Sequence, residues 1–186
     1  GLDIVGALAA FVIFSPVLLA VAIAVKLTSR GPLLYAQERM GLDGRRFKMY
    51  KFRSMRIDAE AEAGARWAKK GDDRRTPVGA FIRRTSLDEL PQLWNVLWGD
   101  MSLVGPRPER PVFVERFREE IPQYMLRHKV KSGMTGWAQV NGWRGDTCLE
   151  RRIACDIYYI RNWSLLLDLR ILWMTIFKGF VNENAY

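Results

Sequence analysis

The sequence contains very little histidine and cysteine: one His and two Cys among 186 residues. With His128 alone, zinc sites with several imidazole ligands and relays that need two histidines are excluded. Cys148 and Cys155 are too few for a disulfide framework or a four-thiolate metal site, and they fit reduced thiols in a cytoplasmic setting. The sequence also lacks a GxxxxGK[ST] phosphate loop, a GxGxxG fingerprint and a GxSxG elbow. These absences argue against an ordinary NTPase, dinucleotide enzyme or serine hydrolase.

Acidic residues are outnumbered, because 29 Lys and Arg stand against 20 Asp and Glu, for a net charge of +9. A hydrophobic share of 49% with 26% charged residues excludes collagen-like, repetitive and disordered chains. The length suits one domain with an appendage, and no repeat or linker divides the chain. The excess of positive charge favours anionic partners such as lipid, phosphate or nucleotide.

Residues 4–25 form an apolar run of 22 positions without a charge. At about 1.5 Å per residue, this run is long enough to cross a hydrocarbon core about 30 Å thick. Ser15 and Pro16 lie near its middle and predict a kink or break, where the serine hydroxyl can bond the carbonyl that the proline frees. The residues leave two geometries open: a kinked spanning helix, which the pattern alone favours, and a re-entrant hairpin in one leaflet. In both, the next domain lies on the cytoplasmic side, because basic residues follow the run: Arg30, Arg39, Arg45 and Arg46.

The remaining pattern predicts short strands and several helices. Residues 30–56 are basic, alternate with aromatic residues, and predict one or two strands around a turn at Gly41–Gly44. Helical character is expected in four stretches: 57–76 (a helix, then a loop), 87–98, 112–130 with an interruption near Pro122, and 147–162. Residues 163–180 are rich in Leu, Ile, Trp and Phe but carry charges. They predict either a helix in the membrane interface, with Trp163, Trp173 and Phe180 at headgroup level, or a core helix.

The acid pair Asp88-Glu89 has two interpretations. Ser86-x-x-Glu89 has the spacing of a capping box, and acids in a first helical turn favour the helix dipole, so the pattern favours a structural role. Pro91 complicates that helix start, because a proline clashes with the preceding turn. Alternatively, a carboxylate flanked by Arg83 and Arg84 stays ionised at neutral pH and acts as a nucleophile or metal ligand toward a phosphorylated substrate. The residues alone leave both interpretations open.

Two further segments suit a ligand site. Pro106 and Pro108 fix the backbone on both sides of Arg107, and a rigidly presented guanidinium is a good bidentate phosphate clamp, although such a tripeptide is also an ordinary loop. Residues 132–142 contain three glycines, a tryptophan and two amides, which fits a tight loop facing a ligand or a bend between elements. His128 has no acidic neighbour in sequence to orient it, so a structural or surface role is expected.

Several segments, in this order, resemble the bacterial sugar transferase family, the monotopic phosphoglycosyl transferases. The matching segments cover nearly the whole chain: FSP at 14–16, QERMG at 37–41, FKMYKFRSM at 47–55, RRTSLDELPQLWNVLWGDMSLVGPRP at 83–108, HKVKSGMTGWAQVNG at 128–142 and DIYYIRNWSLLLDLRIL at 156–172. The endings NGWRGDT at 141–147 and GFVNENAY at 179–186 are similar to members that transfer glucose-1-phosphate to start exopolysaccharide synthesis.

The resemblance implies a two-step reaction at the cytoplasmic face of the bacterial inner membrane. A UDP-sugar, with UDP-glucose as the first choice, binds with Mg²⁺, and Asp88 attacks the β-phosphate and releases UMP. Undecaprenyl phosphate then attacks the resulting phosphosugar–aspartate intermediate. UDP-galactose or an N-acetylamino sugar donor is the alternative within the same chemistry. Two alternatives have no such chemistry: an inactive scaffold for partner glycosyltransferases, and a membrane-tethered polyanion-binding protein. The binding protein would lose affinity steeply as the salt concentration rises.

The resemblance also implies an α+β, mostly helical fold: residues 1–28 as a re-entrant membrane hairpin broken at Ser15-Pro16, and residues 29–186 as a cytoplasmic catalytic domain with short strands and interfacial amphipathic helices. Asp88 and Glu89 are its expected catalytic and Mg²⁺-binding residues. The expected substrate-binding residues are Lys51, Arg53, Arg83, Pro106, Arg107, Pro108 and Gln139. The implied partners are a UDP-sugar, undecaprenyl phosphate and membrane lipid, with no nucleic acid, and homo-oligomerisation is left open. A further N-terminal membrane region is expected in the natural protein, because family members begin with a basic stretch before the acid matched by Asp3.

Overall fold

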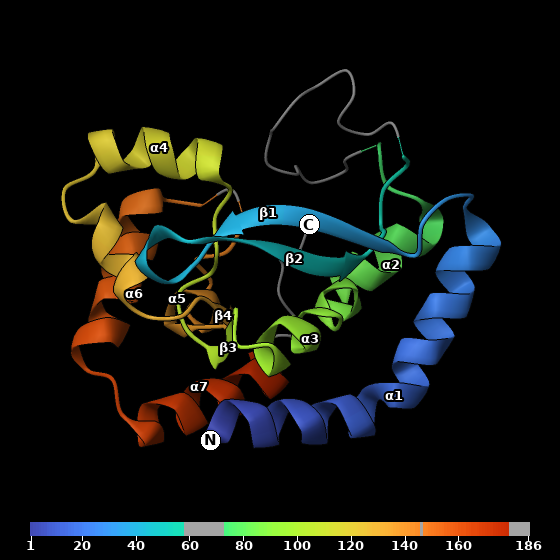
Figure 1. Ribbon diagram of the computed structural model, residues 1–186, viewed down its shortest axis with the longest axis horizontal. Coiled ribbons are helices and arrows are strands. Elements are labelled where there is room, and N and C mark those ends of the chain that lie inside the picture. The colour runs from blue at the N-terminus through green and yellow to red at the C-terminus, as the bar shows by residue number, and fades with distance from the viewer. Residues whose placement is uncertain (58–72, 146, 179–186) are drawn as a thin grey trace.

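The computed structural model describes residues 1–57, 73–145 and 147–178. The fold is mostly helical α+β, as predicted, and its sheet content is small (Figure 1). The helices are α1 Leu2–Thr28, α2 Pro77–Arg84, α3 Gln92–Leu97, α4 Pro111–Glu120, α5 Trp137–Val140, α6 Leu149–Arg161 and α7 Leu165–Lys178. The strands are β1 Leu34–Met40, β2 Arg46–Phe52, β3 Ser102–Val104 and β4 Gly133–Thr135. Short 3₁₀ helices are η1 Leu42–Gly44, η2 Leu87–Glu89 and η3 Tyr124–Lys129.

The apolar run forms one helix, α1, which continues through Pro16. The Ser15 hydroxyl donates to the carbonyl of Val12 over 2.8 Å. Val12 is the residue four positions before Pro16, so its carbonyl is the one that the proline leaves without a backbone donor. The two halves of α1 run in different directions (Figure 1). The expected break is therefore a bend inside a continuous helix, and the expected use of the serine hydroxyl is confirmed.

α1 is long and apolar enough to cross a membrane, and only 11% of its most apolar window is buried. Its few buried residues pack on the domain that follows. Ala7, in the first half, joins a cluster with Met49 and Leu93, while Val25, near the other end, joins a cluster with Phe52. Both halves of the helix thus contribute to the cores that support the rest of the chain.

A hairpin of β1 and β2 confirms the strands predicted around Gly41–Gly44. The strands pair antiparallel, from Leu34 opposite Phe52 to Met40 opposite Arg46. The Asn95 side chain fastens this hairpin to α3, because it accepts from the Tyr50 amide at 3.1 Å and donates to the Lys48 carbonyl at 2.7 Å. The second sheet, in which β3 and β4 pair parallel, was not predicted.

The prediction of one helix over 87–98 was wrong. The segment divides into η2 and α3, with Pro91 at the N-cap of α3. The capping box was also wrong, since Ser86 adopts a left-handed conformation (φ 56°) and its side chain caps nothing. The helical stretch predicted over 112–130 forms α4 and η3, and the interruption expected near Pro122 is confirmed, because Pro122 lies between them. α6 confirms the helix expected over 147–162. Most of the predicted 57–76 helix lies outside the described residues.

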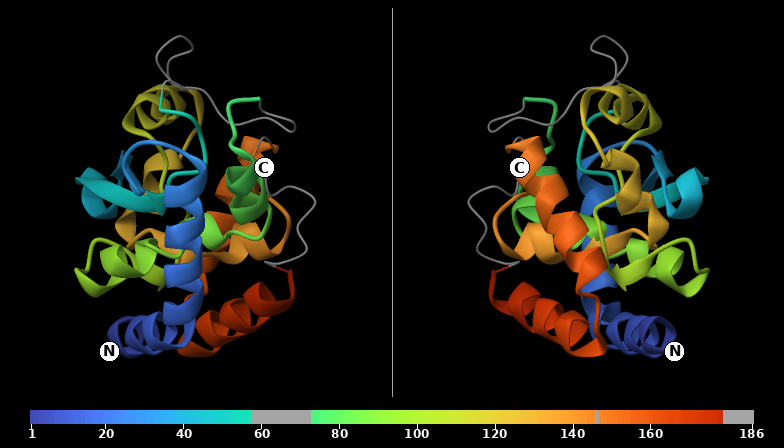
Figure 2. Two further views of the ribbon diagram at one scale, coloured as in Figure 1. Left: turned by 90° about the vertical axis from the view of Figure 1, so that its right-hand side faces the viewer. Right: turned by 90° about the vertical axis from the view of Figure 1, so that its left-hand side faces the viewer.

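α7 has one packed face and one exposed face. Ile171 is fully buried with Val104, Val140 and Tyr159. The outer face exposes large apolar side chains: Leu165, Leu166, Leu169, Trp173, Ile176 and Phe177. The first half of α1 lies at the same end of the molecule as α7 (Figures 1 and 2). The two interpretations of this segment, core and interface, thus correspond to its two faces, while Phe180 lies outside the described residues.

Candidate active site

A cavity of about 350 Å³ lies between the β1–β2 hairpin, η2 and the loop that follows β3. Basic side chains dominate its lining: Arg39, Lys51, Arg53, Arg56, Arg74, Arg83, Arg107, Arg110, Arg144 and Arg152. The acidic residues of the lining are Asp88, Glu89 and Glu109. A concave surface with this charge balance attracts polyanions, which agrees with the expectation drawn from the net charge.

Glu89 is the centre of a cluster of cations. Lys51 Nζ lies 2.8 Å from Glu89 Oε1, and Arg144 Nη2 lies 3.1 Å from the same oxygen. Arg107 donates to both carboxylate oxygens. Burial alone would raise the pKa of Glu89, but the charges of Arg107, Lys51 and Arg144 together hold that pKa well below its ordinary value. Glu89 is therefore a buried carboxylate that its cations keep ionised at neutral pH.

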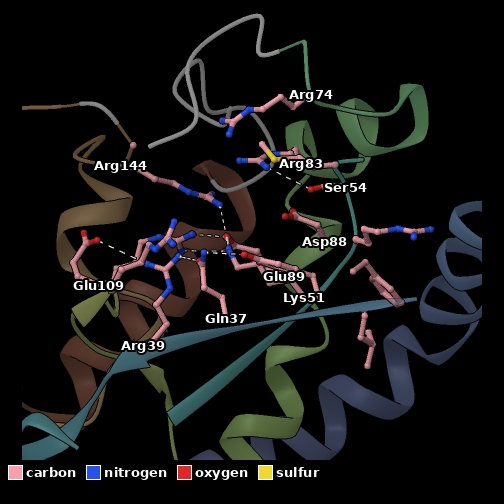
Figure 3. A pocket seen from close by; sticks show the side chains of 18 of the residues that line it. Gln37, Arg39, Lys51, Ser54, Arg74, Arg83, Asp88, Glu89, Glu109 and Arg144 are labelled. Carbon is pink, nitrogen blue, oxygen red and sulfur yellow. Dashed lines mark hydrogen bonds and ion pairs between the residues drawn. The ribbon is translucent and has the colours of Figure 1, made fainter. Parts of the chain in front are cut away.

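Asp88 is the neighbour of Glu89 in the chain but has different surroundings. Its side chain points toward Ser54 and Arg83 (Figure 3). Glu89 instead faces Lys51, on β2, and Arg144. Asp88 forms no ion pair with any residue that the structure describes. Burial, and next the charge of Glu89, raise the pKa of Asp88. Arg83 acts in the expected direction and lowers this pKa, but burial outweighs it.

Lys51 and Arg39 show how strongly the cavity disfavours unpaired charge. Burial lowers the pKa of Lys51 to about 8, although Glu89 acts to raise it. Burial likewise lowers the pKa of Arg39 to about 10, against the attraction of Glu109. Both cations have a carboxylate beside them, and a further anion in the cavity would stabilise both charged forms.

The loop that presents Arg107 is held against β4. The Gly105 amide donates to the Thr135 carbonyl at 2.9 Å, and the Gly133 amide donates to the Pro106 carbonyl at 2.9 Å. A Cβ atom at Gly105 would lie 2.4 Å from the Lys131 carbonyl oxygen, so only glycine allows this approach. The close packing directs the Arg107 side chain into the cavity.

The structure brings together most of the substrate-binding residues predicted from the sequence. Six of the predicted site residues line the cavity: Lys51, Arg53, Arg83, Asp88, Glu89 and Arg107. Pro106 and Pro108 do not line it, and they act through the backbone of Arg107. Gln139 is buried in α5 outside the lining, where it donates to the Met134 carbonyl at 2.8 Å.

Arg53 lines the cavity, but its guanidinium binds the chain at the end of α1. It donates to the Ser29 carbonyl at 2.8 Å, to the Ser29 hydroxyl at 2.7 Å and to the Arg30 carbonyl at 2.5 Å. A cation at the carboxyl end of a helix satisfies free carbonyls and stabilises the helix dipole. Arg53 therefore ties the end of the apolar helix to the wall of the cavity.

Sequence reasoning missed several residues of the lining: Gln37, Arg39, Ser54, Glu109, Trp143 and Arg144. Arg39 and Arg144 lie within the matched segments QERMG and NGWRGDT, and this was the available signal. Arg144 also donates to the Ser86 hydroxyl at 2.9 Å, so a residue 58 positions away holds the turn that carries the acid pair.

The acid pair fits a metal ion in a limited way. Among the described residues, no group of three or more His, Cys, Asp or Glu is placed to hold a metal. Mg²⁺ is commonly bound by one or two carboxylates together with substrate phosphates. Asp88 offers such a carboxylate, whereas the oxygens of Glu89 are already occupied by three cations. The donor set thus fits Mg²⁺ shared between Asp88 and a bound diphosphate.

Comparison with known proteins agrees with the site. The model of the family described as bacterial sugar transferase matches residues 1–182. The chain is 52% identical, over 99% of its length and 40% of the relative's, to a UDP-glucose:undecaprenyl-phosphate glucose-1-phosphate transferase of Escherichia coli strain K12. It is 51% identical, over 95% of its length and 42% of the relative's, to a UDP-N-acetylgalactosamine-undecaprenyl-phosphate N-acetylgalactosaminephosphotransferase of Aeromonas hydrophila. It is 46% identical to a further glucose-1-phosphate transferase, from Caulobacter vibrioides, over its full length and 70% of the relative's. The chain thus spans less than half the length of the first two relatives. Because the family model matches residues 1–182, the chain belongs to the bacterial sugar transferase family.

Proposed function

We propose that this chain transfers a sugar-1-phosphate from a UDP-sugar to undecaprenyl phosphate and releases UMP, with UDP-glucose as the first-choice donor. The observation that supports it most is the unequal acid pair. One buried carboxylate, on Glu89, is saturated by three cations, while its neighbour Asp88 faces the same basic cavity without an ion pair among the described residues. The names of the relatives supply the donor and acceptor classes.

In the first step, ionised Asp88 is the nucleophile. A carboxylate oxygen of Asp88 forms a bond to the β-phosphorus of the donor, and the bond from that phosphorus to the bridging oxygen breaks. The electron pair leaves with UMP, and the sugar phosphate remains on Asp88 as an acyl phosphate. In the second step, a phosphate oxygen of the acceptor attacks the same phosphorus and displaces the carboxylate, which completes the polyprenyl diphosphate sugar.

The basic lining offsets the repulsion between a carboxylate and a diphosphate. Arg83 lies beside Asp88, and Lys51, Arg107 and Arg144 are already arranged around Glu89. Charges that are fixed before the substrate arrives stabilise the transition state without reorganisation. Mg²⁺, if held by Asp88 and the diphosphate oxygens, would add neutralising charge at the reacting phosphorus.

We also propose that α1 is re-entrant, with both ends on the side of the catalytic domain. At its start, Asp3 accepts from the Ser102 hydroxyl at 2.8 Å and from the Leu103 amide at 2.9 Å. At its end, Arg53 donates to the carbonyls of Ser29 and Arg30, the two residues that follow the helix. Since both ends bind the same domain, a helix that left this domain on the far side of a bilayer would break one set of contacts.

The apolar outer surfaces support a seat in one leaflet of a membrane, which we propose to be the cytoplasmic leaflet of the inner membrane. α7 and the first half of α1 lie at one end of the molecule (Figure 2). Both expose large apolar side chains. Trp94 on α3 and Trp98 at its C-cap are 44% and 63% exposed, and the ring centroids of Trp94 and Phe11 are 5.5 Å apart. Tryptophans at the edge of an apolar surface mark the headgroup level of a bilayer. This seat would bring a lipid-borne phosphate toward the cavity.

The test measures UMP release by the protein in lipid vesicles with Mg²⁺, undecaprenyl phosphate and a panel of UDP-glucose, UDP-galactose and two UDP-N-acetylamino sugars. Wild type is expected to release UMP faster from UDP-glucose than from the other donors. Asp88→Asn is expected to lose at least about 10³-fold in rate, the scale of removing a catalytic nucleophile. Without acceptor, intact mass should show a phosphosugar adduct on wild type and none on Asp88→Asn. No release from any donor, or an adduct on the Asn variant, would contradict the proposal.

A further inference from the structure

A buried ion pair lies behind the cavity and is not part of its lining. Arg127 Nη2 is 2.8 Å from Asp156 Oδ2, and the two side chains are 2% and 3% exposed. Arg127 Nε also donates to the same oxygen at 3.1 Å. A buried ion pair adds little net stability, because desolvation of both charges offsets their attraction. Its position in the molecule therefore calls for a different explanation.

The remaining donors of Arg127 point to that explanation. Nη1 donates to the Tyr124 hydroxyl at 3.2 Å, and Nη2 donates to the backbone carbonyl of Arg107 at 2.8 Å. Arg107 is the residue whose guanidinium binds both oxygens of Glu89. A continuous series of contacts thus runs from Asp156 through Arg127 to the backbone of Arg107, and from its side chain to the acid pair.

The local sequence explains why carbonyl contacts matter here. Pro106 and Pro108 have no amide hydrogen, so this loop has few backbone donors with which to fix itself. Three successive carbonyls are instead held by three different segments. The Pro106 carbonyl accepts from the Gly133 amide, the Arg107 carbonyl from Arg127, and the Pro108 carbonyl from Arg39 Nη1 at 3.2 Å. The middle contact is the one that the buried ion pair supplies.

We propose that Arg127 and Asp156 are positioning residues, which fix the carbonyl of Arg107 and thereby aim its guanidinium at Glu89 and at the diphosphate of a bound nucleotide. Asp156 holds the Arg127 fork in place, and Arg127 holds the backbone. Neither side chain touches the cavity. This inference rests on the proposed function only in the choice of a nucleoside diphosphate as the ligand.

A double-mutant cycle separates this role from simple structural support. Arg127→Met with Asp156→Leu replaces both charges by apolar groups of similar size, a change that often preserves the stability of a buried site. The probe is UDP, and its Kd is measured by calorimetry in the wild-type and Arg107→Ala backgrounds. With Arg107 present, the replacement is expected to weaken UDP binding about tenfold, the scale of one charge-assisted hydrogen bond. In the Arg107→Ala background, it is expected to have no further effect, because its role acts through Arg107.

Tyr124→Phe is the matched control. It removes the other hydrogen bond of Arg127 and leaves the Asp156 pair and the Arg107 carbonyl contact in place. A lower melting temperature with unchanged UDP affinity is expected. If the double replacement does not fold, Arg127→Lys, which keeps a cation beside Asp156, should show a smaller loss with the same dependence on Arg107.

Equal loss of affinity in both backgrounds, or no loss with Arg107 present, would overturn the inference. Failure of wild type to bind UDP would overturn it together with the proposed function. Wild type that binds UDP but releases no UMP from any UDP-sugar would contradict the proposed function alone, since the cycle needs binding and not turnover.

Discussion

The cavity and the apolar end of the molecule contrast in how far the chain satisfies its own groups. Around Glu89, the buried charges other than Asp88 are largely paired within the protein: three cations bind one carboxylate, and Glu109 pairs with Arg152 at 2.9 Å. At the other end, α1 and α7 expose large apolar side chains that no described residue covers. The first region is organised before a ligand arrives, whereas the second exposes an apolar surface of the kind that marks a membrane or protein contact, which we propose to be lipid. Arg53, at the cavity wall, joins the two by holding the end of α1.

The largest expected effect concerns the apolar end. Each end of α1 lies on one side of the membrane or the other, so the labelling result is all-or-none. Leu2 and Leu27 are 40% and 81% exposed near the two ends. Single-cysteine variants Leu2→Cys and Leu27→Cys, each lacking Cys148 and Cys155, are treated with a membrane-impermeant maleimide. Because both ends bind the same domain, both cysteines should react in inverted membrane vesicles and neither in right-side-out vesicles.

The control for this labelling is a chain that keeps only Cys148, an exposed residue of the catalytic domain, which reports the side of that domain. Labelling of Leu2→Cys and Leu27→Cys from opposite sides would show that α1 spans the bilayer. Pro16→Ala sharpens the test, since it restores the backbone donor to Val12 and removes the cause of the bend. We expect this variant to show a mixture of the two labelling patterns.

The next effect concerns the charge balance of the cavity. Glu89→Gln keeps the size of the side chain but leaves Lys51, Arg107 and Arg144 without their shared anion. Breaking a buried ion pair from one side costs about 3–5 kcal/mol, so the free energy of unfolding should fall by that order. Chemical denaturation measures it. Glu120→Gln is the matched control, because Glu120 is half exposed in its pair with Arg116. Its loss should stay below about 1 kcal/mol, and equal losses in the two variants would contradict the contrast between cavity and surface.

The sequence predicts the parts of the molecule that depend on local pattern. Alternation around Gly41–Gly44 predicts the hairpin, helical spacing predicts α6, and the uncharged run predicts α1 with its bend at Ser15-Pro16. The catalytic role of the acid pair was predicted from the family motif, because the local pattern favoured a capping box instead. Local spacing could not predict the role of Arg144, because its contact with the Ser86 hydroxyl joins residues far apart in the sequence. Ser86 itself has a left-handed conformation, where a helix start was expected.

Tertiary contacts account for the other differences. β3 and β4 have three residues each, too few to show a period, and they pair across an intervening helix. Arg53 and Arg107 were both predicted to bind substrate. One binds the end of α1 and the other binds Glu89. A guanidinium donates to whichever carbonyl or carboxylate the fold places beside it. Neighbouring residues in the sequence do not show which acceptor that is.

The smallest expected effect is the pH dependence of the stability difference between Asp88→Asn and wild type. The pKa of Asp88 is raised in the folded protein, mainly by burial, so the folded state holds its proton at pH values where the unfolded chain has released it. Ionising Asp88 in the folded protein therefore lowers stability as pH rises through the window between its ordinary and its raised pKa. Above this window, Asp88→Asn should be more stable than wild type, and the gain should shrink to nothing as pH falls below about 3.9, the ordinary value for Asp. Glu89→Gln should show the opposite sign, because the folded pKa of Glu89 is depressed and its contribution is lost as pH falls. Thermal melts of both variants from pH 3 to 8 measure the two slopes, and slopes of the same sign would mean that the two acids share one environment after all.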